Sequence, residues 1–202
     1  MDTLFSILIL VMSVVIHEVC HGYAAQALGD PTARYAGRLT LNPLKHLDPI
    51  GSIIVPFILA IIPPHMVFGW AKPVPVNPYN FRNQKWGEVL VAAAGPGANL
   101  VVAVIFGLII RFGITYQFLP LPFLEISKLL VLINILLAIF NFVPIAPLDG
   151  SKILFGLLPD HFLDAKNWLE RHSFVIFLFF IFFLWKFIEP LVALLFRFVT
   201  GL

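Results

Sequence analysis

Long apolar runs separated by short polar stretches dominate the chain. A hydrocarbon core about 30 Å thick needs roughly 20 apolar residues in helical form, at about 1.5 Å per residue. Four runs reach that length and predict membrane helices: residues 3–28, 88–110, 123–144 and 174–199. A fifth run, residues 50–62, ends at two prolines and reaches only about 20 Å, so it predicts either a short crossing or a re-entrant helix.

The polar stretches 29–49 and 66–87 are expected outside the membrane. Residues 34–41 alternate loosely between apolar and polar positions, which is typical of a short strand. The prolines of residues 70–78 favour an edge strand or a polyproline-like segment. The predicted fold is an all-α membrane protein with four to five transmembrane or re-entrant helical segments and short strand-like cytoplasmic segments. We expect residues 1–202 to form a single membrane-embedded domain.

The composition supports the bilayer as the solvent. Hydrophobic residues make up 60% of the chain and charged residues 12%, against about 45–50% and 25% in soluble domains. The net charge of +2 is too small to indicate a nucleic-acid partner. Cys20 is the single cysteine, which excludes an intrachain disulfide. The first apolar run lacks a basic leader and a small-residue cleavage site, so we expect a retained membrane helix rather than a signal peptide.

The loop charges favour one topology. If residues 50–62 dip into the membrane and return, nine of the 13 basic residues share one side of it: Arg34, Arg38, Lys45, Lys72, Arg82, Lys85, Lys152, Lys166 and Arg171. A full crossing would divide the basic residues almost evenly. Because cytoplasmic loops are enriched in Lys and Arg, we expect a re-entrant segment, an outside N-terminus and cytoplasmic residues 29–87.

The motif His17-Glu18-Val19-Cys20-His21 lies at the end of the first apolar run. His17 and His21 fall on one helix face, one turn apart, which is the spacing of a metal chelate. Imidazole nitrogen suits zinc, and catalytic zinc takes three protein ligands. Glu18 points about 100° away, where it can reach a metal-bound water. A chance HExxH on a surface helix is the alternative, but ionisable groups at membrane depth need a partner, which favours a metal site.

Residues 141–150 supply further candidate chemistry. Pro144 and Pro147 break the end of the fourth apolar run, and such a break is tolerated in membranes where it lines a polar cavity. Asp149 offers a third metal ligand there, unless Asp149-Gly150 is an ordinary turn. Asn141 is a candidate to bind a substrate carbonyl or the developing oxyanion, with a helix-packing amide as the alternative.

Together, HExxH and an NxxPxxPLDG run about 120 residues later resemble the site-2 protease family of intramembrane zinc metalloproteases. The resemblance extends to segments typical of the compact bacterial and archaeal branch without a PDZ domain: residues 29–33, 41–43, 69–78, and 94–96 with Asn99. It implies that one Zn²⁺ per chain is held by His17, His21 and Asp149, with Glu18 as general base.

The function implied is hydrolysis of peptide bonds in a transmembrane protein or peptide substrate, inside or near the bilayer. The resemblance to the bacterial and archaeal branch implies a prokaryotic cell membrane, and the loop charges favour an active site near its cytoplasmic side. The alternative is a membrane metal-binding or transport protein without proteolytic activity. A structural site has no use for a carboxylate beside its ligands, so Glu18 favours the protease over a binding protein. Against a transporter, the candidate ligands cluster at one depth, and the sequence shows no second membrane-embedded carboxylate that would continue a path.

Two polar residues keep open roles. Asn99 follows the small residues 94–96, which mark close helix contact, so we expect a packing amide. We expect His46 to be an interfacial histidine, with an extra metal or substrate contact as the alternative.

The topology can be tested by labelling. Single cysteines placed beside Lys45 and Arg82, in a Cys20→Ser background, should react with a membrane-impermeant reagent from the same, cytoplasmic side, because both belong to the larger group of basic residues. Intact cells and inverted vesicles distinguish the two sides. Labelling from opposite sides would show that residues 50–62 cross the membrane.

Overall fold

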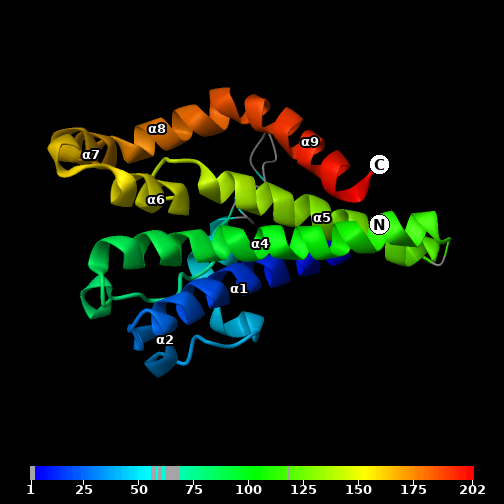
Figure 1. Ribbon diagram of the computed structural model, residues 1–202, viewed down its shortest axis with the longest axis horizontal. Helices are drawn as coiled ribbons and strands as arrows, with labels where there is room; N and C mark the ends of the chain where they lie inside the picture. Colours follow the sequence, from blue (N-terminus) through cyan, green and yellow to red (C-terminus); the bar gives the residue numbers. More distant parts are fainter. Residues whose placement is uncertain (1–2, 56–57, 59–60, 62–68, 118) are drawn as a thin grey trace.

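A computed structural model of the protein describes residues 3–55, 58, 61, 69–117 and 119–202. Three helices are long and apolar enough to cross a membrane: α1 (Thr3–Ala27), α4 (Gln84–Thr115) and α5 (Leu121–Phe142). The longest, α4, packs against both others and lies between them in Figure 1. Both chain ends lie toward the end of the bundle where α4 connects to α5 (Figure 1). These helices confirm three of the four long membrane segments expected from the sequence.

The fourth expected segment, residues 174–199, is bent. The helical stretches Ser173–Phe183 and Ile188–Thr200 are long and apolar enough to span a membrane only when they are taken together. The angle between their helix axes is 68°. The pair contains α8 (Ser173–Phe179), a π-helical turn (Phe180–Leu184), a 3₁₀ turn (Trp185–Phe187) and α9 (Ile188–Thr200). π-Turns are a common cause of helix kinks. The pair arches over α5 in Figure 1.

Short helices fill the connections. These are α2 (Thr32–Tyr35), Pro43–Lys45, Pro49–Ile54, Pro78–Asn80, α6 (Asp149–Leu157), Asp160–Phe162 and α7 (Leu163–Arg171). The structure describes only the first part of the predicted short segment 50–62 without gaps, and this part forms the π-helix Pro49–Ile54. Much of the remainder lies outside the described residues, so whether it crosses stays a prediction.

The expected strands are wrong for the described residues, which contain no strand. The first candidate, residues 34–41, begins in the short helix α2 and turns at Gly37, where φ is +65°. In the second, residues 70–78, the N–H groups of Trp70, Lys72 and Val74 donate to the backbone carbonyls of Gly51 and His46 and to the Glu18 carboxylate. Proline at positions 73 and 75 removes two further donors, and the three that remain bond to separate elements rather than to one neighbouring strand, so no ladder forms. We call residues 70–77 the strap.

Asp30 anchors the far end of the strap. Its fully buried carboxylate accepts hydrogen bonds from the Asn77 N–H and the Asn80 Nδ2, both at 2.7 Å, and from the N–H and hydroxyl of Thr32. Burial alone would raise the pKa of this carboxyl, but these hydrogen bonds outweigh burial and lower the pKa. Asp30 therefore joins the end of α1 to the strap as an ion.

The packing follows the expectation of a bilayer. A buried core joins α4, α5, the π-turn and α9: Ala103, Ile110, Val131, Ile135, Phe180, Ile188 and Val192. The outer faces carry large apolar side chains that are more than 40% exposed, among them Ile7, Leu8, Val101 and Ile105. Soluble monomers rarely expose continuous apolar surface on this scale. Lipid is the solvent that suits these faces.

Replacing Asp30 should destabilise the protein. Asp30→Ala removes the shared acceptor of four hydrogen bonds, each typically worth about 0.5–1.5 kcal/mol, so we expect a melting temperature lower by roughly 5 °C or more in detergent. Since the pKa of Asp30 is lowered in the folded state, its stabilisation is complete above about pH 4 and is lost as the pH falls through the folded pKa. The gap in melting temperature should therefore be constant from pH 7 to about pH 5 and shrink at lower pH. Asp164→Ala, at an exposed carboxylate on α7, is the control. Equal melting curves for the two variants would contradict the role of Asp30.

Candidate metal centre

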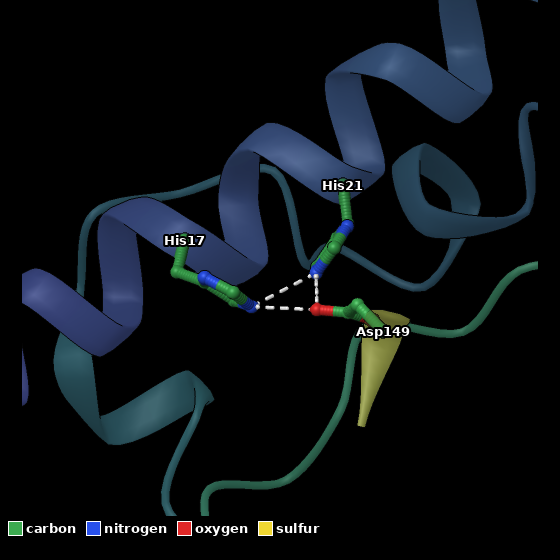
Figure 2. A group of neighbouring side chains, drawn as sticks. All are labelled: His17, His21 and Asp149. Atoms are coloured by element: carbon green, nitrogen blue, oxygen red, sulfur yellow. Dashed lines mark hydrogen bonds and ion pairs between the residues drawn. The ribbon is translucent and has the colours of Figure 1, made fainter. Parts of the chain in front are cut away.

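Three side chains from two distant parts of the chain converge on one point. His17 and His21 project from α1, and Asp149 projects from the first residue of α6 (Figure 2). The two Nε2 atoms lie 3.0 Å apart, and each lies 3.1 Å from the Asp149 Oδ2. Both histidines are less than 9% exposed, and the Asp149 side chain is 13% exposed. The three residues form a buried group that could hold a metal ion.

The outer nitrogens of both imidazoles are engaged. The His21 Nδ1 lies 2.6 Å from the Val91 carbonyl oxygen, which can only accept, so Nδ1 carries the proton. The His17 Nδ1 lies 2.7 Å from the Asn99 Oδ1, which is likewise an acceptor. In the neutral tautomers fixed by these bonds, both Nε2 lone pairs point toward Asp149. Metal-binding histidines characteristically donate their other N–H in this way.

The group requires a positive charge at its centre. Two bare Nε2 atoms and a carboxylate oxygen would otherwise face one another as three acceptors without a donor. Around a tetrahedral zinc with bonds of about 2.0–2.1 Å, ligand atoms stand about 3.3 Å apart, close to the 3.0–3.1 Å found here. The donor set therefore fits zinc.

Gly95 lets α4 approach the two histidines. A Cβ at this position would meet the Cε1 atoms of His21 and His17 at 2.6 and 2.7 Å, closer than real Cβ contacts. The sequence identified residues 94–96 only as a point of close helix contact. The structure gives Gly95 a specific task, because the imidazoles lie directly against the α4 backbone. Val91, Gly95 and Asn99 share one face of α4 at intervals of four residues.

The proline-containing turn after α5 delivers Asp149. The helix ends at Phe142, and the chain passes Pro144 and the cis Ala146–Pro147 bond before α6 begins. Gly150 is buried, and a Cβ there would overlap the carbonyl groups of Phe142 and Val143. The glycine thus allows α6 to begin directly against the end of α5. Asp149 and Gly150 thus open helix α6 rather than forming an ordinary turn.

Glu18 lies next to the metal group but is not part of it. Its Oε2 accepts a 2.8 Å hydrogen bond from the Val74 N–H in the strap, and Oε1 makes no hydrogen bond within the described part of the chain. The side chain is partly buried. One carboxylate oxygen is thereby fixed, which leaves the other to exchange a proton. The role of general base stays a prediction.

The structure separates the remaining candidates. Asn141 lies in the last turn of α5, partly buried, and its Nδ2 donates to the Leu137 carbonyl at 2.9 Å; its contact with substrate stays a prediction. His46 is only 1% exposed, and its Nε2 lies 2.8 Å from the Thr40 carbonyl. Within the described residues it does not join the metal group. Asn99, expected only to pack helices, also contacts a metal-site histidine.

Comparison of the sequence with known proteins assigns the chain to a family. Residues 114–184 match peptidase family M50. The chain is also similar to YwhC of Bacillus subtilis (strain 168), with 36% identity over 179 residues, which is 86% of this chain and 78% of the relative. The chain belongs to peptidase family M50. This is the site-2 protease family that the motifs resemble, so the sequence assignment to a zinc metalloprotease family is confirmed.

Other relatives have similar descriptions. Rip2 of Mycolicibacterium smegmatis (strain ATCC 700084 / mc(2)155) is 30% identical over 176 residues, 78% of this chain and 60% of the relative. The protein sll0528 of Synechocystis sp. (strain ATCC 27184 / PCC 6803 / Kazusa) is 43% identical over 72 residues, 36% of this chain and 18% of the relative. All three relatives are named "Putative zinc metalloprotease". No solved structure matches the chain.

A pair of glycine substitutions tests the M50 metal centre. Gly95→Ala should lower bound zinc well below that of the parent, because the new methyl group displaces both imidazoles. Gly97→Ala is the matched control two residues away, where a Cβ meets nothing within 4 Å. Zinc in the purified proteins is measured by atomic emission. Equal zinc content in both variants would show that close approach at Gly95 does not shape the site.

Proposed function

We propose that this protein is an intramembrane metalloprotease that binds one Zn²⁺ per chain and cleaves transmembrane protein or peptide substrates. The observation that carries the proposal is the position of Glu18 beside a buried group that has three protein ligand atoms among the described residues. Structural zinc sites use four protein ligands, whereas catalytic sites use three and keep one position for water or substrate. A transporter or a storage site would gain nothing from Glu18.

The reaction divides among few residues. Zinc bound by His17, His21 and Asp149 would activate water for attack on a substrate carbonyl and polarise that carbonyl. Glu18 accepts the water proton and later delivers it to the leaving amine. Its Oε2 is held by the Val74 N–H at 2.8 Å, so the proton is accepted at Oε1. Asn141, on the turn that leads to Asp149, donates to the substrate carbonyl or to the developing oxyanion.

The surroundings of the site support a membrane substrate. The site begins at the seventeenth residue of the chain, after fourteen residues of an apolar helix whose outer side chains suit lipid. The strap is joined to Glu18 through the hydrogen bond from the Val74 N–H. We place the site near the cytoplasmic side of a prokaryotic cell membrane, because the strap lies in the stretch that holds most of the basic loop residues.

Glu18→Gln separates a protease from a metal-binding protein. Glutamine keeps the size of the side chain and an acceptor for the Val74 N–H, but it cannot take the water proton. The variant should retain parental zinc, since Glu18 is not a ligand, and should cleave a single-span substrate at least 10²–10⁴-fold more slowly, about the typical contribution of general acid–base catalysis. Cleavage in detergent, followed by gel electrophoresis with and without a chelator, measures this.

Cys20→Ser is the matched control, on the same helical turn and also partly buried, and it should cleave like the parent. Parental activity in Glu18→Gln would refute the role of base. A loss of zinc in that variant would instead make Glu18 part of the metal site.

A further inference from the structure

Two buried asparagines connect His17 to the other membrane helices. The Asn99 Nδ2 on α4 donates to the Ser13 carbonyl of α1 at 3.3 Å and to the Asn134 Oδ1 of α5 at 2.8 Å. The Asn134 Nδ2 donates to the Ser13 hydroxyl and to the Leu130 carbonyl, both at 2.9 Å. Asn99 and Asn134 are 0% exposed, and Ser13 is 2% exposed. Neither Ser13 nor Asn134 stands out in the sequence as a site residue.

The connections fix which way each amide points. The Asn99 nitrogen faces two acceptors, the Ser13 carbonyl and the Asn134 Oδ1, so it must be the donor end of the amide. Its Oδ1 is therefore turned to the His17 Nδ1. Asn134 is oriented by the same logic, because its nitrogen faces the Leu130 carbonyl, which can only accept. Together these hydrogen bonds require that His17 carries its proton on Nδ1 and leaves Nε2 unprotonated.

We propose that Asn99 and Asn134 are positioning residues of the metal centre: Asn99 sets the tautomer and ring orientation of His17, and Asn134 acts through Asn99 by holding its amide in the required direction. The proposal rests on zinc being the ion bound, as in the proposed function. Neither residue contacts the ligand position itself. Both are too deeply buried to exchange their partners for water, so the arrangement is fixed before metal binds.

This assignment explains why two polar amides, Asn99 and Asn134, are present in the apolar spans α4 and α5. An amide in hydrocarbon is costly unless it is paired, and a pair of apolar residues would pack α4 against α5 without that cost. The amides instead link α5, the helix that precedes Asp149, to the His17 imidazole, so that the position of α5 helps to orient His17 toward Asp149. Partners of this kind typically contribute about 10–100-fold to metal affinity.

The test compares zinc affinity in Asn99→Ser, Asn134→Ser and the double variant. Serine is too short to bridge the helices, but its hydroxyl can bond to the carbonyl four residues earlier, so the new side chain stays paired while the His17 Nδ1–H loses its acceptor in Asn99→Ser. Ser127→Ala is the matched control: Ser127 lies on the same face of α5 two turns before Asn134, is 0% exposed, and has no hydrogen-bond partner among the described residues. Melting temperatures confirm that each purified full-length variant is folded.

We expect Asn99→Ser to weaken zinc binding about 10–100-fold in competition with a chelator, and Asn134→Ser to weaken it about tenfold. Because Asn134 acts through Asn99, the double variant should bind zinc no more than about twofold worse than Asn99→Ser. Ser127→Ala should match the parent. Cobalt in place of zinc provides a spectroscopic readout: the visible bands should shift in both asparagine variants, because the orientation of His17 changes, and not in Ser127→Ala.

Other outcomes overturn the proposal. Parental zinc affinity and an unchanged cobalt spectrum in Asn99→Ser would make Asn99 a packing amide only. Losses that multiply in the double variant would show that Asn134 acts independently of Asn99. These measurements use no substrate, so a failure here is distinguishable from a failure of the proteolytic function, which Glu18→Gln tests.

Discussion

The packing of α1 against α4 is the constraint on which the metal centre depends. Each helix presents a row of residues at intervals of four: Ser13, His17 and His21 on α1, and Val91, Gly95 and Asn99 on α4. Rows of this spacing are the ridges through which helices commonly interdigitate. Here the bulky imidazoles fill the space left by Gly95, while Val91 and Asn99 supply acceptors on either side. One contact therefore brings the backbones close, orients both rings and directs their Nε2 atoms inward.

The rest of the structure completes this contact. The proline turn and Gly150 return the chain after α5 so that Asp149 faces the two histidines. The strap, anchored by Asp30 at one end and by the backbone carbonyls at the other, supplies the Val74 N–H to Glu18. In an apolar bundle, each of these polar groups needs a partner. Once these groups are paired, the three acceptor atoms of the metal group still face one another without a donor, and a cation would satisfy them.

The bilayer shapes what the site can do. The exposed apolar faces of α1 and α4 suit lipid, and His17 and His21 lie on α1, one of the two helices that carry these faces. Membership of peptidase family M50 agrees with a hydrolytic metal centre in this setting. The 68° bend between α8 and α9 replaces a straight final span, and the two helices arch over α5 (Figure 1).

The sequence by itself predicted the long membrane helices and the candidate metal ligands. Hydrophobic run length located α1, α4 and α5, because spanning a bilayer requires a fixed number of apolar residues, and the HExxH spacing put two histidines on one helix face. Asp149 was found as a candidate because prolines mark a broken helix. The tertiary structure alone decided which partners these residues have. No periodicity predicts that Asn99 meets His17 or that Val74 meets Glu18, since those contacts join residues 82 and 56 positions apart. The strands expected at residues 34–41 and 70–78 failed for the same reason: extended backbone becomes a strand only with a ladder partner, and the strap's donors are used by backbone carbonyls of separate elements and by Glu18 instead.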